Sequence, residues 1–406
     1  MNYTSIPGGV TAAQGFLASG IHCGIRKNKS KRDLALLYSP TLCSAAAVYT
    51  TNKVKSAPIR ICRQHLENGR AQAVIVNSGN ANTCNADGER KALRMCEVAA
   101  EALHIEPQNV LVASTGVIGQ PLPIEPIEES GADLAKALSR DGGTDAAEAI
   151  LTTDTVKKEI AVTFPLGGKS VTMGGMAKGS GMIHPNMATM LGFVTTDAAI
   201  SPEMLQKALS DVVEDSFNMV SVDGDTSTND TLLVLANGLA ENEEITKDGE
   251  EYETFRSALL YLCRELSKML AADGEGATKL LICTVSGAKT AADARGVAKS
   301  VICSSLVKAA MFGSDANWGR VLCAIGYSGC EVDVSRVRVE FSSSKGSILV
   351  CENGAGVAFS EEKAKEILLQ REITIAVTLG DGSAEAQAYG CDLTYDYVKI
   401  NGDYRT

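Results

Sequence analysis

Apolar and polar positions alternate along the chain in short blocks that predict strands and helices in turn. Residues 73–77 and 109–113 are short apolar, β-branched runs that end in polar residues and glycine, which is typical of strands. Between them, residues 88–104 carry apolar side chains at helical spacing on one face. The pattern therefore predicts strand, helix, strand, with polar, glycine-rich loops beginning at Asn77 and Ser114. Such loops at strand ends often carry the chemistry of α/β proteins.

The same pattern continues to the end of the chain and predicts a mixed α/β fold. Several of the expected strands are short and hairpin-like, so we expect mixed sheets rather than a purely parallel one. The expected strands are two short ones within 33–50 around a Ser-Pro turn, then 279–285, 321–325 and 373–379. Four helices are expected here. One begins after a Ser201 cap, one carries an apolar stripe over 255–269, one spans 297–312, and one begins after a Ser360 cap.

Composition places the chain among compact globular proteins. Of 406 residues, 45% are hydrophobic and 21% charged, with 38 Gly and 10 Pro. One core rarely suffices at this length, so we expect two or three structural lobes.

The charge balance argues against a nucleic-acid partner. The formal net charge is −11, and the one basic cluster, at 26–32, is interrupted by Asn28 and Ser30 and followed by Asp33. We interpret this cluster as a solvated turn. No apolar run reaches the roughly 18 residues that a membrane span requires, so no membrane association is expected.

The twelve cysteines are scattered and include no C-x-x-C pair. The start of the chain is polar and lacks the apolar core of a signal peptide, so we expect reduced thiols and a cytoplasmic protein. The four histidines, at 22, 65, 104 and 184, are too dispersed to indicate a metal site.

Residues 174–192 combine five glycines with four methionines and fit neither a helix nor a strand. A glycine-rich turn packed under a sheet would explain them, and so would a buried functional loop. A phosphate loop is excluded because Lys178 precedes its glycine. Residues 223–229 lack the glycine that a calcium loop requires at its sixth position, and the S-x-x-K match at 305–308 is attributed to chance. We interpret His184 as a packing or surface residue.

Several motifs resemble one known family over essentially the whole chain. Among them are residues 8–16, 49–58, 76–82, 113–119 and 150–155, and the most specific are 178–189 and 222–230. On these motifs the chain resembles the ornithine acetyltransferases, the bifunctional glutamate N-acetyltransferases of arginine biosynthesis.

This resemblance implies a self-processing enzyme with an N-terminal threonine nucleophile. Cleavage of the Ala188–Thr189 bond would give an α segment, residues 1–188, and a β segment, residues 189–406. The Thr189 hydroxyl would carry the acetyl group. The α-amine of Thr189, freed by the cleavage, has an ordinary pKa of about 7.7–8.0 and could act as the base.

The resemblance also implies the reaction and its residues. N-acetylornithine would acylate the enzyme and glutamate would take the acetyl group, with Thr115 and Gly116 as oxyanion donors. Lys178 suits a substrate carboxylate and Glu275 suits the side-chain ammonium of ornithine. The implied substrate-binding residues are Thr152, Lys178, Thr189, Glu275, Asn401 and Thr406, with Thr153 an alternative to Thr152. No cofactor or metal is implied, the use of acetyl-CoA as a second donor is left open, and two α and two β segments would assemble.

Two other functions are compatible with parts of this pattern. An amidohydrolase or aminopeptidase with the same kind of nucleophile would let water, rather than glutamate, resolve the acyl-enzyme. A binding protein without activity is disfavoured by the intact nucleophile, oxyanion pair and cleavage motif.

Overall fold

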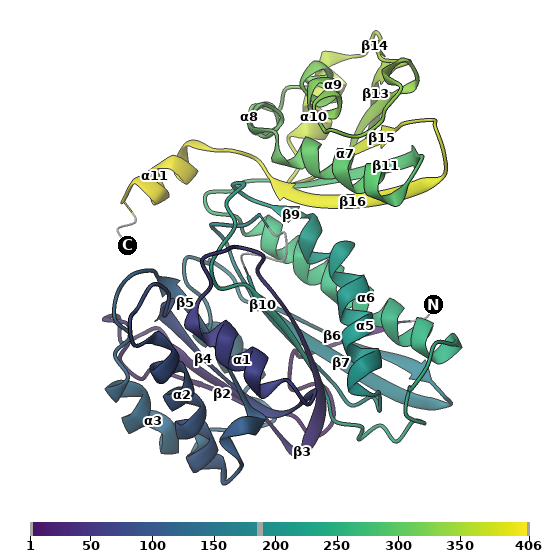
Figure 1. Cartoon of the computed structure of the whole chain (residues 1–406). Coiled ribbons are helices and arrows are strands. Elements are labelled where there is room, and N and C mark those ends of the chain that lie inside the picture. Colours follow the sequence, from purple (N-terminus) through teal and green to yellow (C-terminus); the bar gives the residue numbers. More distant parts are fainter. Residues whose placement is uncertain (1–2, 185–189, 404–406) are drawn as a thin grey trace.

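Two β-sheets with helices packed on their faces make up the structure, a computed structural model that describes residues 3–184 and 190–403 (Figure 1). In the described residues the first sheet has nine strands in the order β1-β6-β7-β8-β10-β3-β4-β5, with β2 paired to β3. The β4–β5 and β8–β10 pairs are parallel, and the others are antiparallel. These strands are β1 (Thr4–Ile6), β2 (Leu17–Ile21), β3 (Leu34–Tyr49), β4 (Arg70–Asn80), β5 (Val110–Val117), β6 (Lys158–Leu166), β7 (Lys169–Lys178), β8 (Leu191–Thr196) and β10 (Thr231–Ala236).

The second sheet has seven strands in the described residues, in the order β14-β13-β12-β15-β11-β16-β9. It pairs β11 with β15 and β16 with β9 in parallel, so both sheets are mixed and the predicted mixed α/β fold is confirmed. Its strands are β9 (Val220–Ser221), β11 (Leu280–Ala288), β12 (Arg338–Ser343), β13 (Gly346–Glu352), β14 (Ala355–Gly356), β15 (Glu372–Thr378) and β16 (Ala384–Cys391).

Helices cover the sheets in layers, because each apolar sheet face must be buried against another element (Figure 1). Helices α1 (Ala57–His65), α2 (Gly88–Leu103), α3 (Glu125–Lys136) and α4 (Gly143–Ala149) share one core with the first sheet. Helices α5 (Pro202–Glu214) and α6 (Glu250–Ala272) cover its other face, and α6 also contacts the second sheet. The far face of the second sheet packs on α7 (Ala291–Cys303), α8 (Ser305–Phe312), α9 (Trp318–Gly326) and α10 (Glu361–Leu368).

Alternation along single strands produces this layering. In β10, Leu233 belongs to the core under α1–α4, whereas its neighbours Leu232 and Val234 belong to the core under α5 and α6. In β11, Leu281 faces the α7–α10 core and Ile282 the α6 side. Successive strand residues point to opposite faces, so each strand supplies two cores at once.

Most of the predicted elements are confirmed. The stripe over 255–269 is the buried face of α6, and the runs at 73–77, 109–113, 279–285 and 373–379 lie in β4, β5, β11 and β15. The predicted caps are also found: the Ser201 hydroxyl accepts the N–H of Met204 at 3.4 Å, and that of Ser360 accepts the N–H of Lys363 at 3.2 Å.

Three predictions of elements are wrong. Residues 33–50 form one strand, β3, because a register shift between Tyr38 and Cys43 lets the strand continue past Pro40. The predicted helix over 297–312 is two helices, since Ser304 is extended (φ −67°, ψ 111°) and its hydroxyl caps α8. The predicted strand over 321–325 is helix α9, where Asn317 caps the N–H of Arg320; a short apolar run does not by itself distinguish strand from helix.

The glycine-rich segment over 174–192 is also more regular than expected. Its first residues complete β7, and its last residues begin β8. A Cβ atom at Gly174 would lie 1.9 Å from the carbonyl oxygen of Gly9, and one at Gly175 would lie 2.9 Å from a Leu262 methyl. The glycines therefore allow close packing within a strand, where the sequence was interpreted as irregular.

The basic cluster at 26–32 is only partly a solvated turn. Lys27, Lys29 and Lys31 are exposed. Arg26 is half-buried and donates to the Leu151 carbonyl, while Arg32 forms an ion pair with Asp145 at 2.9 Å. The arginines tie this turn to the protein, and the lysines face solvent.

All twelve cysteines lie in the described part of the chain and none forms a disulfide. Within residues 3–184 and 190–403, no helix combines the length and apolar character that crossing a membrane would need.

The Ala188–Thr189 bond lies outside the described residues, between two strands that pair with each other. Lys178 at the end of β7 is opposite Leu191 at the start of β8. Strand β10 in turn pairs with β3, so residues from both sides of the bond build the first sheet.

We therefore expect the segments 1–188 and 189–406 to stay associated if the bond is cut, because separation would break the β7–β8 and β3–β10 ladders and expose their shared cores. Native and denaturing mass spectrometry of one sample measure this. The expected result is one complex in native buffer and two chains in denaturant. Free segments in native buffer would contradict it.

Candidate active site

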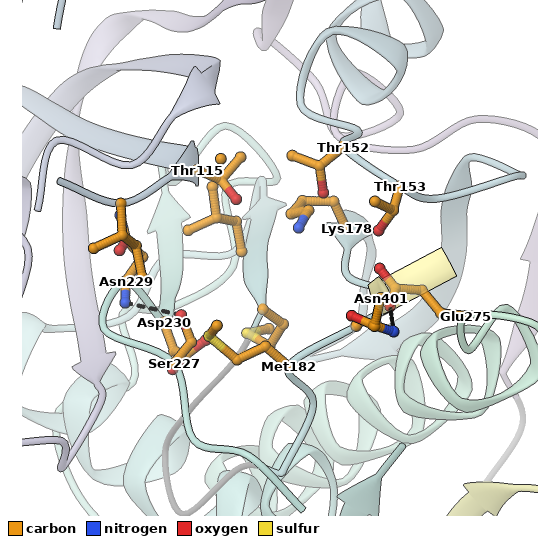
Figure 2. A pocket seen from close by; sticks show the side chains of 15 residues that line it. Thr115, Thr152, Thr153, Lys178, Met182, Ser227, Asn229, Asp230, Glu275 and Asn401 are labelled. Carbon is orange, nitrogen blue, oxygen red and sulfur yellow. Dashed lines mark hydrogen bonds between the residues drawn. The ribbon is translucent and has the colours of Figure 1, made fainter. Parts of the chain in front are cut away.

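A cavity of about 280 Å³ opens beside the ends of β5 and β7 and the starts of β8 and β10. Figure 2 shows its side chains converging from segments that are far apart in the sequence. The lining residues are Thr115, Gly116, Ile118, Thr152, Thr153, Lys178, Gly181, Met182, Met190, Leu191, Ser227, Asn229, Asp230, Glu275 and Asn401. The cavity thus contains every sequence-predicted site residue that the structure describes.

Thr115 and Gly116 lie in strand β5, not on the loop that was predicted to follow it. Parallel pairing with β4 continues farther than expected and places Gly116 beside Gly79. Gly116 has φ +133°, and a Cβ there would lie 2.4 Å from the carbonyl carbon of Gly79. Only glycine fits this contact, so the close approach of β4 and β5 beside the cavity requires it.

Lys178 ends β7 and presents a cation in a largely closed setting. The residue is only 7% exposed. Burial lowers the pKa of Lys178, and the Asp154 carboxylate partly opposes this shift. Burial would raise the pKa of Asp154, but Lys178 and Lys158 outweigh it and hold that pKa well below its usual value. A ligand carboxylate reaching Lys178 would favour the charged ammonium in the same way.

The adjacent threonines Thr152 and Thr153 both line the cavity. The Thr152 N–H donates to Asp154 at 3.0 Å, and the Thr152 hydroxyl lies 3.5 Å from the same carboxylate oxygen. Either hydroxyl can therefore be reached from the cavity, and the choice of Thr152 over Thr153 remains a prediction.

Glu275 and Asn401 form one wall from two different elements. Glu275 follows α6, and Asn401 lies on α11 (Tyr395–Asp403); the Asn401 amide donates to the Glu275 carboxylate at 2.8 Å. A Cβ at Gly181 would lie 2.3 Å from that carboxylate group, so a side chain there would displace the carboxylate from its present position. The chain is helical as far as Asp403, and Thr406 lies outside the described residues.

Thr189 and Ala188 also lie outside the described residues, but Met190 lies within them and lines the cavity. Its carbonyl accepts the N–H of Thr231 at 3.1 Å, at the start of β10. The chain therefore leaves the predicted cleavage position at the cavity wall.

Sequence reasoning did not assign roles to Ser227, Asn229 or Asp230, all of which line the cavity. The Asn229 amide donates to the carbonyls of Ala81 and Ser114, at 2.6 and 2.7 Å, and so ties this loop to the strand that carries Thr115. Burial raises the pKa of Asp230 well above its usual value. The motif over 222–230 was the available signal, but it served only to identify a resemblance.

The acidic start of that motif stabilises a neighbouring turn. The Asp223 carboxylate accepts the N–H groups of Met182 and Ile183, at 2.6 and 2.8 Å. Met182 has φ +55°, which is unfavourable for a methionine, so these two bonds hold a strained backbone beside the cavity. Among the described residues, no group of three or more His, Cys, Asp or Glu side chains is arranged to hold a metal.

His184 packs against the second sheet's strand β9 and does not line the cavity. Its Nδ1 lies 3.1 Å from the Ser221 hydroxyl, and burial, with Lys299 nearby, lowers its pKa to about 4. These contacts agree with the packing role expected for it.

The chain matches one protein family over nearly its whole length. The ArgJ family model covers residues 17–406. The arginine biosynthesis bifunctional protein ArgJ of Caldanaerobacter subterraneus subsp. tengcongensis is 51% identical over 402 residues, which is 99% of each chain. The protein of that name from Bacillus subtilis is 50% identical over 403 residues, 99% of this chain and 97% of its own.

Structural comparison gives a related result. The crystal structure of the arginine biosynthesis bifunctional protein from Bacillus halodurans is 47% identical and superposes with a TM-score of 0.50. The match covers 52% of this chain and 98% of that one.

We expect Gly116→Ala to destabilise the protein by about 1–3 kcal/mol or more, because the new methyl group would clash with β4 and the residue would keep a positive φ. Gly119→Ala is the matched control, since Gly119 has φ +77° but no atom lies within 4 Å of the point that its Cβ would occupy. Urea unfolding measures both. Equal losses in the two variants would show that the close β4–β5 approach is unimportant.

Proposed function

The chain belongs to the ArgJ family, and we propose that it transfers an acetyl group from N-acetylornithine to glutamate in arginine biosynthesis. The single observation that carries the proposal is the match over 99% of both chains with an arginine biosynthesis bifunctional protein. A hydrolytic function, in which water resolves the acyl-enzyme, is disfavoured by this membership.

Autocleavage between Ala188 and Thr189 would supply the nucleophile. The Thr189 hydroxyl attacks the acetyl carbonyl, its proton passes to the α-amine, and ornithine leaves with a proton as the acetyl ester forms. The glutamate amine then attacks the ester and regenerates the hydroxyl. One observation supports this assignment: Met190, the residue that follows Thr189, lines the cavity.

Thr115 and Gly116 would stabilise the tetrahedral oxyanion of both steps. A hydroxyl and a backbone N–H can each donate to it, and such donors contribute about 3–4 kcal/mol where they have been removed one at a time. The position of both residues in the β4–β5 ladder supports this role, because their donors would be fixed before the reaction begins.

The charges of the cavity suit an amino acid with an N-linked acetyl group. Lys178 would bind the α-carboxylate, and Glu275, held by Asn401, would bind the side-chain ammonium of ornithine. Thr152 and Thr406 would complete the contacts. Glutamate can share the Lys178 contact, since it also has an α-carboxylate.

Three further features belong to this proposal. Their name, bifunctional protein, supports acetyl-CoA as a second acetyl donor, as a substrate and not as a resident cofactor. We place the protein in the cytoplasm as an assembly of two α and two β segments.

The nucleophile is tested by Thr189→Ala. We expect the unchanged protein to give two chains in denaturant that meet at the Ala188–Thr189 bond, and the variant to give one chain near 42.6 kDa without transfer activity. Denaturing mass spectrometry and an assay of ornithine release measure this. Glutamate should accelerate ornithine release by the unchanged protein; equal release with water alone would indicate a hydrolase, and two chains from the variant would refute the mechanism.

The carboxylate site is tested by Lys178→Met. Loss of a charge-assisted hydrogen bond of about 1.5–3 kcal/mol should raise KM for N-acetylornithine roughly 10- to 150-fold. Lys169→Met, at the exposed start of the same strand, is the control and should leave KM unchanged. Similar KM values for both variants would remove Lys178 from the binding site.

A further inference from the structure

Three buried charged side chains of alternating sign are joined behind the cavity: Asp154, Lys158 and Asp273. Lys178, which lines the cavity, interacts with Asp154 through its charge. The Lys158 ammonium donates to Asp154 at 2.7 Å and to Asp273 at 2.6 Å. The side chains of Lys158 and Asp154 are fully buried, and that of Asp273 is 5% exposed. Lys158 therefore contacts two carboxylates that are almost completely shielded from solvent, yet it does not line the cavity.

The Asp154 carboxylate connects two walls of the cavity. It accepts the N–H of Thr152 at 3.0 Å and that of Gly179 at 2.6 Å. Gly179 follows Lys178 directly. The carboxylate therefore holds the backbone of two walls at one point: the threonine wall, formed by Thr152 and Thr153, and the lysine wall, formed by Lys178.

Asp273 connects the third wall to the same group. Its carboxylate accepts the N–H of Thr155 at 3.1 Å, and its backbone carbonyl accepts the Ser180 hydroxyl at 2.6 Å. Two residues later, the N–H of Glu275 donates to the Ser180 carbonyl at 2.9 Å. The position of Glu275 therefore depends on Asp273. Among the described side chains, Lys158 donates to both Asp273 and Asp154, and Thr155, the residue after Asp154, also donates to Asp273.

The charge balance explains why such a group can be buried. Two cations and two anions leave no net charge, whereas loss of Lys158 would leave two carboxylates facing one cation without solvent. A buried pair of like charges separates or takes up a proton, and either response would move the backbone N–H groups that the carboxylates hold.

We propose that Lys158 is a positioning residue that holds the threonine, lysine and glutamate walls of the cavity at a fixed spacing. It acts through Asp154 and Asp273 and touches no substrate. The inference rests on the proposed function for the identity of the substrates, but the spacing of the walls is independent of it.

Lys158→Met tests this role, with Lys279→Met as the control. Lys279 is also a buried lysine, but its ammonium donates to the Met311 carbonyl and the Ser314 hydroxyl at the end of α8. We expect Lys158→Met to raise KM for N-acetylornithine and for glutamate at least tenfold while kcat changes less than threefold. Lys279→Met should leave both KM values within twofold even if it lowers Tm equally.

A double variant tests the proposal if Lys158→Met alone does not fold. Lys158→Met with Asp273→Asn removes one cation and one anion and leaves the charges of Lys178 and Asp154 in balance, so it should fold and still raise KM at least tenfold. A KM within twofold of the unchanged protein in the folded variant would overturn the proposal. So would an equal KM increase in Lys279→Met.

Hydrogen exchange separates this proposal from the proposed function. Exchange in the Lys158 variants should accelerate at residues 150–157, 178–184 and 273–277, and uniform acceleration over the first sheet would overturn the positioning role. If the unchanged protein transfers no acetyl group from N-acetylornithine, the proposed function fails, and the exchange pattern alone then decides the role of Lys158.

Discussion

Backbone hydrogen bonds between β7 and β8 join the two halves of the chain at the cavity. They hold Lys178 opposite Leu191, and the parallel β8–β10 pair brings Thr231 to the same edge. Because β10 also pairs with β3, the sheet connects this edge to the strands that carry Gly79 and Gly116. The cavity therefore depends on a ladder that both segments build, and a cut between them would leave the ladder itself intact.

Burial of charge is the second condition that shapes the site. Burial disfavours the charged ammonium of Lys178, and the negative charge of Asp154 partly offsets this effect. Lys158 and Asp273 in turn balance Asp154, so the charged group extends behind the cavity to the end of α6. Asp154 and Asp273 also accept hydrogen bonds from the segments that form the cavity walls. The balance of buried charge and the geometry of the site therefore depend on the same side chains.

Local sequence was sufficient where the pattern was long or had clear caps. The apolar stripe of α6 and the serine caps of α5 and α10 were predicted because they depend on neighbours within a few residues. Prediction from local sequence was wrong where a contact with a distant segment determined the structure. Pro40 lies within a strand because the pairing with β4 has a register shift there. Gly174 lies within a strand, where the close packing of Gly9 leaves no room for a side chain. The run at 321–325 was too short for its period to identify a helix.

For the site, the motifs and their resemblance determined the chemical groups: Thr115, Gly116, Lys178, Glu275 and Asn401 all line the cavity. Thr152 and Thr153 could not be separated, and Thr189 and Thr406 lie outside the described residues. Only the tertiary structure brought Asp230 to the cavity and joined Asp154, Lys158 and Asp273 behind it. The physical reason is that residue types and local hydrogen bonds depend on residues close together in the sequence. The pairing of buried charges depends instead on which distant segments the sheets bring together.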